Sequence, residues 1–174
     1  MVERKKYPLR LNKMKVRIED LPEKKMVGKS VNMSLAQNKT GEVWRNFQMN
    51  KLAITNAVGT NLYSIQVYEN LNYFENFNPQ TVFTKWAAVE VNEIINIPNG
   101  FNAFTLPKGL YAVFVHRGLP SEFPKTMQFI LGQWLPQSEY ELDHRPHFEL
   151  LGLNYKNNHP DSEEEVWIPI CKKM

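Results

Sequence analysis

The sequence predicts an α+β fold in which duplicated β-α-β-β units form an antiparallel sheet, with two helices on one face and a ligand cleft between the halves. Three observations predict it: the second half contains an amphipathic helix, strand-like segments flank that helix, and the first half shows the same order of segments. We expect a single effector-binding domain over residues 1–174, with pseudo-repeats at roughly 16–91 and 101–171.

The helix of the second half has the most regular apolar spacing. Ser121 is placed to cap its first turn, Pro124 lies early enough to be tolerated, and Pro136 ends it. Its apolar stripe consists of Phe123, Met127, Ile130, Leu131, Trp134 and Leu135. Segments rich in β-branched and aromatic residues predict strands at 110–116, 147–153 and 165–170.

The first half predicts the same order of elements. A helix is expected to begin near Thr40, and its buried face would consist of Val43, Trp44, Phe47 and Ile54. Strands are expected at 26–33, 62–68 and 82–91. The dipeptide Leu21-Pro22 ahead of the first strand is echoed by Leu106-Pro107 roughly 85 residues later, as a repeated unit requires.

Side-chain alternation in the last two strands predicts which residues lie away from the helices. We assign the aliphatic positions of the final strand to the helix side, which leaves Glu165 and Trp167 on the helix-free face. In the strand before it, the same reasoning assigns Phe148 and Leu150 to the helix side. Glu149 is then expected to share the helix-free face with the indole and carboxylate of the final strand.

The first half extends this prediction. With Ile65 and Val67 assigned to the helix side, Tyr68 falls on the helix-free face, and so does Trp86 of the following strand. The candidate ligand-binding residues are therefore Glu149, Trp167, Glu165, Tyr68 and Trp86. Aromatic rings around a carboxylate favour a bulky apolar or cationic ligand. The alternative interpretation is that the tryptophans only pack and the glutamates are only solvated.

Composition narrows the class of protein. The hydrophobic fraction of 43% and charged fraction of 22% are typical of a folded globular domain, and the net charge of +3 comes from basic residues near the chain ends. We therefore expect no direct nucleic-acid binding, because no basic recognition segment is present. The absence of a signal peptide and of long apolar runs predicts a cytoplasmic protein with no membrane contact.

Metal and cofactor chemistry is not expected. The four histidines, at positions 116, 144, 147 and 159, lack the spacing of a zinc site, and no phosphate-binding glycine loop is present. Cys171 is the single cysteine, so an internal disulfide is excluded, and no neighbouring motif activates its thiol.

Four segments of the second half carry a specific resemblance. They are Gly109 to Gly118, Gln133 to Tyr140, Arg145 to Glu149, and Glu165 to Ile170. In this order they resemble the GyrI-like, or AraC-type effector-binding, family, whereas the first half fits the duplicated layout with a diffuse signature. The resemblance implies a pseudo-symmetric pair of units with a ligand cleft between them.

The resemblance also implies roles for particular residues. Glu149 matches the glutamate that meets lipophilic cations in multidrug-sensing regulators of the family, and Glu165 and Trp167 fall where the family places an acid and an aromatic. No family role is carried over to Tyr68 or Trp86. Regulators of the family usually carry a helix-turn-helix segment, for which the roughly 15 residues before the first pseudo-repeat are too few. Any role in regulation is therefore expected to involve a protein partner.

Three functions stay open at this point. The leading hypothesis is a non-catalytic small-molecule binder that acts as a sensor or sequestering protein. The second is a hydrolase of electrophilic, alkylating small molecules, in which Glu149, with Glu165, activates water. The third is a gyrase-inhibitor-like regulator that works by protein contact.

Overall fold

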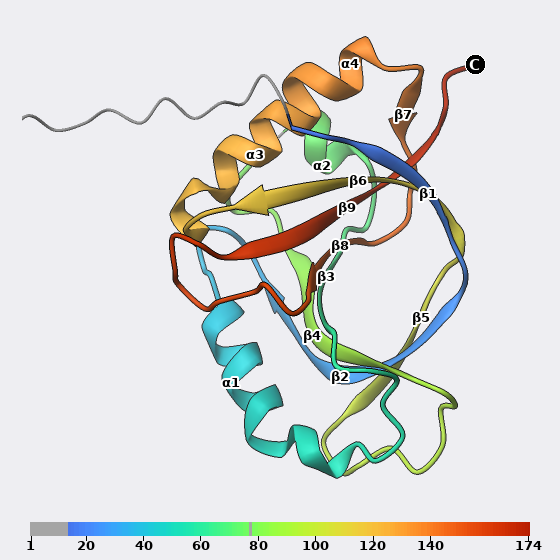
Figure 1. The fold of residues 1–174 in the computed structure, drawn as a ribbon, viewed down its shortest axis with the longest axis vertical. Helices are drawn as coiled ribbons and strands as arrows, with labels where there is room; N and C mark the ends of the chain where they lie inside the picture. The colour runs from blue at the N-terminus through green and yellow to red at the C-terminus, as the bar shows by residue number, and fades with distance from the viewer. Residues whose placement is uncertain (1–13, 77) are drawn as a thin grey trace, which may run out of the picture.

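The computed structural model describes residues 14–76 and 78–174, and these form an open nine-stranded sheet in which every pair is antiparallel (Figure 1). The strand order is β1-β6-β9-β8-β3-β4-β2-β5, and β7 pairs with β9 beside this path. The strands are β1 Arg17–Leu21, β2 Lys24–Met33, β3 Leu62–Val67, β4 Phe83–Val91, β5 Asn102–Leu106, β6 Gly109–Arg117, β7 Tyr140–Leu142, β8 His147–Leu151 and β9 Glu163–Lys172. The predicted antiparallel α+β class is confirmed.

The sheet is pseudo-symmetric about its centre, where β3 pairs with β8. One half contributes β2, β4 and β3, and the other contributes β6, β9 and β8. The leading strand of each half crosses to the opposite half: β1 precedes β2 but pairs with β6, and β5 precedes β6 but pairs with β2. The repeated Leu-Pro dipeptides mark these crossings, because Leu21 ends β1, Leu106 ends β5, and both side chains are buried.

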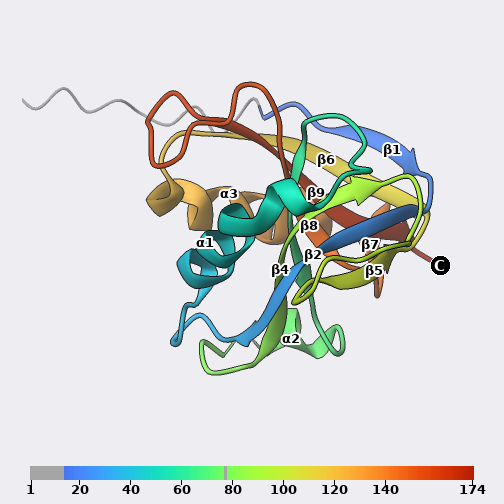
Figure 2. The same ribbon diagram turned by 90° about the horizontal axis from the view of Figure 1, so that it is seen from below.

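Two longer helices lie on the same side of the sheet (Figure 2). The first is α1 (Thr40–Asn50), which begins where the sequence predicts. The second is a continuous helical run, α3 (Phe123–Phe129), a π-helical stretch (Ile130–Trp134) and α4 (Leu135–Gln137). Ser121, predicted to cap this run, lies instead in a 3-10 turn, Pro120–Glu122. Another 3-10 turn, Lys51–Ala53, follows α1, and the short helix α2 spans Asn72–Glu75.

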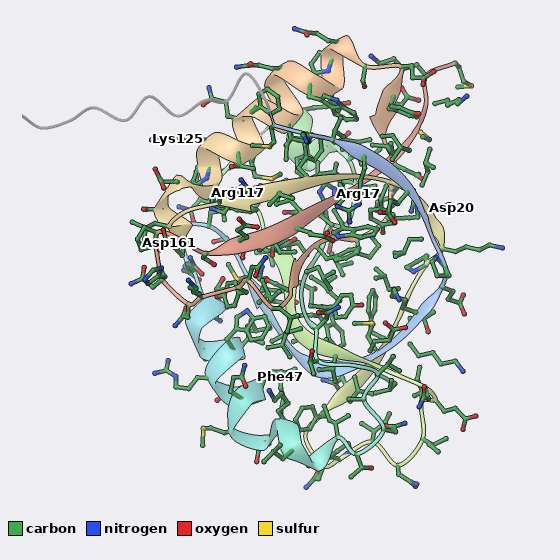
Figure 3. The ribbon with its side chains drawn as sticks, in the orientation of Figure 1. Arg17, Asp20, Phe47, Arg117, Lys125 and Asp161 are labelled. Atoms are coloured by element: carbon green, nitrogen blue, oxygen red, sulfur yellow. The ribbon has the colours of Figure 1, made fainter. Side chains whose placement is uncertain are left out.

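Each longer helix covers one flank of the sheet. Under α1, Val43 and Phe47 pack against Ala87 and Val89 of β4, and Figure 3 shows Phe47 between the helix and the sheet. The other helical run packs on β6 and β9 through a cluster that includes Ile130. None of the helices formed by the described residues has the length and apolarity needed to cross a bilayer.

The helix-free face carries a large apolar cluster of its own. Phe148 stacks on Trp167 with ring centroids 5.1 Å apart, and Trp86 and Ile65 belong to the same cluster. The assignments made for β4 and β9 are therefore confirmed, whereas the sides predicted for β3 and β8 are wrong. The helices cover the flanks and leave the central strands without a helix, so these strands turn their apolar side chains to the opposite face.

Candidate functional site

Glu149 lies on the helix side of the central strand β8. Its partners across the neighbouring strands are Val166 of β9, which faces the helical run, and Ser64 of β3. The side chain is only 12% exposed. The amide nitrogen of Gln66 donates to both carboxylate oxygens at 2.9 Å, and Lys85 Nζ lies 3.4 Å from Oε2. The carboxylate is thus enclosed at the seam between the two halves of the sheet.

A second carboxylate, Glu164 of β9, belongs to the same group. It pairs across the strands with His116 of β6, on the helix side. Burial raises the pKa of the Glu164 carboxyl from 4.5 to about 7; the charge of Glu149 adds to the rise and Lys85 opposes it. Two carboxylates therefore share one ammonium, and the second is half protonated near neutral pH.

Aromatic residues adjoin these charges. Burial raises the pKa of Tyr68, and the charges of Tyr73 and Glu149 add to this rise. The Tyr68 ring lies 5.2 Å from His147, and Phe74 of α2 stacks on the same imidazole at 4.8 Å. Burial lowers the pKa of His147 to about 3, so its ring is neutral at physiological pH. The wall beside Glu149 therefore consists of uncharged rings.

The helix-free face holds carboxylates in a different setting. Glu165 accepts a hydrogen bond from Trp167 Nε1 at 2.9 Å and one from Arg17 Nη2 at 2.7 Å (Arg17 is labelled in Figure 3). Glu90 of β4 accepts hydrogen bonds from Lys24 at 2.8 Å and from the Tyr63 hydroxyl at 3.1 Å. Glu165 and Glu90 thus each accept a hydrogen bond from a cation and one from an aromatic side chain, and Arg17 also bonds Glu19 on the same face.

The structure divides the five residues predicted from the sequence into two groups. Glu149 and Tyr68 lie together on the helix side, whereas Trp86, Trp167 and Glu165 lie on the helix-free face. The prediction that all five share one face is wrong, because the sides assigned to β3 and β8 were reversed.

Sequence reasoning missed Gln66, Lys85 and Glu164 as neighbours of Glu149. A partial signal was present. Polar side chains at alternate positions of β3 and β8, and a lysine among the apolar residues of β4, indicate that each of these strands has polar side chains on one side.

At the predicted cleft between the halves, the Glu149 side chain is enclosed, since only 12% of it is exposed. A hollow of about 240 Å³ lies between α1 and β2, and its lining includes Lys29, Glu42 and Asn46 but none of the neighbours of Glu149. A ligand that reaches Glu149 must therefore displace groups that cover it. In the described ranges, no cluster of three or more His, Cys, Asp or Glu side chains could hold a metal ion.

A sequence model of the family described as GyrI-like small molecule binding domain matches residues 14–170. The transcriptional regulator BrlR of Pseudomonas aeruginosa is 25% identical over 163 residues, which are 92% of this chain and 57% of BrlR. This chain thus spans little more than half the length of that relative.

Solved structures share the fold at low sequence identity. SAV2435 bound to tetraphenylphosphonium has a TM-score of 0.70 and 17% identity, over 91% of this chain and 94% of SAV2435. A hydrolase from Listeria innocua has a TM-score of 0.57 and 14% identity, over 90% of this chain and 92% of the hydrolase.

Proposed function

Since this chain belongs to the GyrI-like small molecule binding domain family, we propose that it binds a bulky apolar or cationic molecule beside Glu149. The observation that carries the proposal is an enclosed carboxylate at the seam, held by Gln66 and bordered by the neutral rings of Tyr68 and His147. Rings supply contact area and the carboxylate supplies charge complementarity. The fold neighbour bound to tetraphenylphosphonium supports this choice of ligand class.

The helix-free face has a supporting role in this proposal. Trp86 and Trp167 are closely packed, and Glu165 is already paired with Arg17. We assign Trp167, which stacks on Phe148 of β8, to holding β9 against β8 behind Glu149, and Trp86 to packing β4 against Phe104 of β5. The likeness to a transcriptional regulator suggests that ligand binding alters a contact with a protein partner.

Substitution of Glu149 tests the site. We expect Glu149→Gln to lower the affinity for tetraphenylphosphonium by about tenfold or more, because the ligand loses a poorly hydrated countercharge. The fold should survive, since glutamine keeps the shape of the side chain. Isothermal titration calorimetry measures the affinity, and circular dichroism checks the fold.

Matched controls separate the two faces. Glu90→Gln and Glu165→Gln remove the same charge from the helix-free face, and neither should change the affinity by more than about twofold. Loss of binding in Glu165→Gln together with normal binding in Glu149→Gln would place the ligand on the helix-free face and refute the proposal.

Hydrolysis is a second candidate function, favoured by one observation. Glu164, whose pKa is raised to about 7, lies in the same group as Glu149, and a carboxyl tuned near neutral pH is able to accept a proton from an attacking water. A hydrolase among the fold neighbours agrees with this reading. Incubation with a cyclopropane-bearing alkylator, followed by mass spectrometry, tests it. Turnover no faster than in buffer, or equal turnover by Glu164→Gln, would remove this candidate.

A further inference from the structure

Lys85 is the one cation bonded to Glu149 in the described part of the chain. It lies on the helix side of β4, pairs across the strands with Gln66 of β3, and its side chain is only 8% exposed. Lysine is rarely buried to this extent unless it is paired. The next residues on the same side of β4 are the apolar Ala87 and Val89. This ammonium therefore stands at the border between an apolar core and the carboxylates of the seam.

The contact between Lys85 and Glu149 is looser than an optimised ion pair. The two groups lie 3.4 Å apart, whereas charge-assisted hydrogen bonds of this type are usually about 2.7–2.9 Å long. Lys24 and Glu90, the comparable pair on the helix-free face, are 2.8 Å apart although both side chains are more exposed. The shorter bonds to Glu149 come from the Gln66 amide. The position of the carboxylate is therefore fixed by this amide and not by the ammonium of Lys85.

The charge of Lys85 affects how well the site binds cationic ligands. With Glu149 ionised and Lys85 protonated, the two charges cancel, and the protonation of Glu164 decides whether the group carries an extra negative charge. A permanent cation that enters beside Glu149 also meets the ammonium, and in a poorly hydrated site this repulsion is strong. An uncharged ligand of the same shape does not meet this opposition.

We propose that Lys85 sets the charge selectivity of this site: its ammonium neutralises Glu149 and disfavours permanent cations relative to uncharged ligands of the same shape. The inference rests on the proposed function, because it needs a ligand beside Glu149. It makes Lys85 a specificity-determining residue, whose removal converts the site into one that prefers cations.

Two probes with the same rings and different charge test this inference. Tetraphenylphosphonium is a permanent cation, and triphenylphosphine oxide is uncharged. Both are titrated by calorimetry at neutral pH into the full chain and into Lys85→Met, Glu149→Gln and the double variant. We expect Lys85→Met to bind the cation about tenfold or more tightly, with the affinity for the oxide changed less than about threefold. The double variant should lose this gain.

A matched control removes a lysine from the other face. Lys24→Met makes the same change of net charge and breaks a Lys–Glu pair, and it should leave both affinities unchanged. If Lys85→Met does not give a native circular dichroism spectrum, Lys85→Gln replaces it, because glutamine is able to donate to Glu149.

The outcomes separate the inference from the proposed function. If Glu149→Gln weakens cation binding and the folded Lys85 variant shows no increase in affinity for the cation, the inference about Lys85 is wrong and the proposed ligand site beside Glu149 is retained. If no substitution at Glu149 or Lys85 changes the affinity for either probe, both the inference about Lys85 and the proposed function are wrong. A gain of equal size in Lys24→Met would show a general effect of net charge and would also overturn the inference.

Discussion

The two faces of the sheet both place carboxylates beside aromatic rings, but they differ in how these carboxylates are paired. On the helix-free face, Glu90 and Glu165 each accept a close hydrogen bond from a cation, at 2.8 and 2.7 Å, and one from an aromatic side chain. At the seam on the helix side, the ammonium of Lys85 lies 3.4 Å from Glu149, and its charge acts on Glu164 as well. A face with paired charges stabilises the fold, whereas a face with an unbalanced carboxylate is suited to a ligand.

The largest effect should come from the packed face. Trp167→Ala removes an indole that is 6% exposed and stacks on Phe148, and we expect it to lower the free energy of unfolding by about 3–5 kcal/mol. Chemical denaturation measures this loss. A small loss of stability combined with the loss of ligand binding would instead make Trp167 part of the ligand site and erase the distinction between the faces.

The next effect concerns acid stability on the helix side. Burial lowers the pKa of His147 from 6.5 to about 3, so the unfolded chain binds the extra proton first as the pH falls. The stability linked to this histidine is complete above about pH 6.5 and is lost toward pH 3. Between neutral pH and about pH 4 the loss is on the order of 3 kcal/mol.

His147→Phe should abolish this part of the pH dependence, because phenylalanine keeps a ring against Phe74 and binds no proton. Urea denaturation at a series of pH values measures it. His159→Gln, at an exposed loop position, is the control and should keep the wild-type dependence. An unchanged acid transition in His147→Phe would contradict the burial of a neutral imidazole beside Tyr68.

A smaller effect is expected at Glu164, with the opposite dependence on pH. Burial raises the pKa of the Glu164 carboxyl, the charge of Glu149 raises it further, and the charge of Lys85 lowers it. His116 pairs with Glu164 across the strands from β6, and the charge of Glu164 adds to the raised pKa of Tyr155 in the β8–β9 loop. The native state therefore holds the proton more tightly than the unfolded chain. Stability should be complete below about pH 4.5 and should fall as the pH rises through about 7.

Glu164→Gln should remove this fall and raise the free energy of unfolding near pH 8 by about 1–2 kcal/mol, after allowance for partial exposure of the carboxylate. Thermal unfolding across this pH range measures the change. Glu163→Gln breaks an exposed pair with Arg117 and should do little. A destabilised Glu164→Gln at alkaline pH would mean that the seam needs both negative charges.

Most of the fold could be predicted because the strong patterns are local. Both longer helices and six strands lie where periodicity indicates. Strands β1, β5 and β7 were missed since each is short, and β1 and β5 alternate polar and apolar residues only weakly. The pairing of β1 and β5 with the opposite half is a property of the whole sheet, and the sequence of one segment does not show it.

The candidate site could be predicted only in part. Alternation correctly places Phe148 and Leu150 on one side of β8 and Glu149 on the other, but it does not say which side carries the helices. The assignment of apolar side chains to the helix side is correct for β9 but wrong for β8. The helices cover only the flanks, and both faces of this sheet bury apolar residues. The face that the apolar side chains of a strand occupy depends on which strands the helices cover, and the sequence of a single strand does not show this.

The position of a bound ligand is the most direct test of this account. Crystals grown with a brominated benzyl-triphenylphosphonium would locate the ligand through the anomalous signal of bromine. We expect the signal on the helix side, beside Glu149 and Tyr68, with the covering groups displaced. A signal on the helix-free face, against Trp86 and Trp167, would contradict the assignment of the ligand site to the seam.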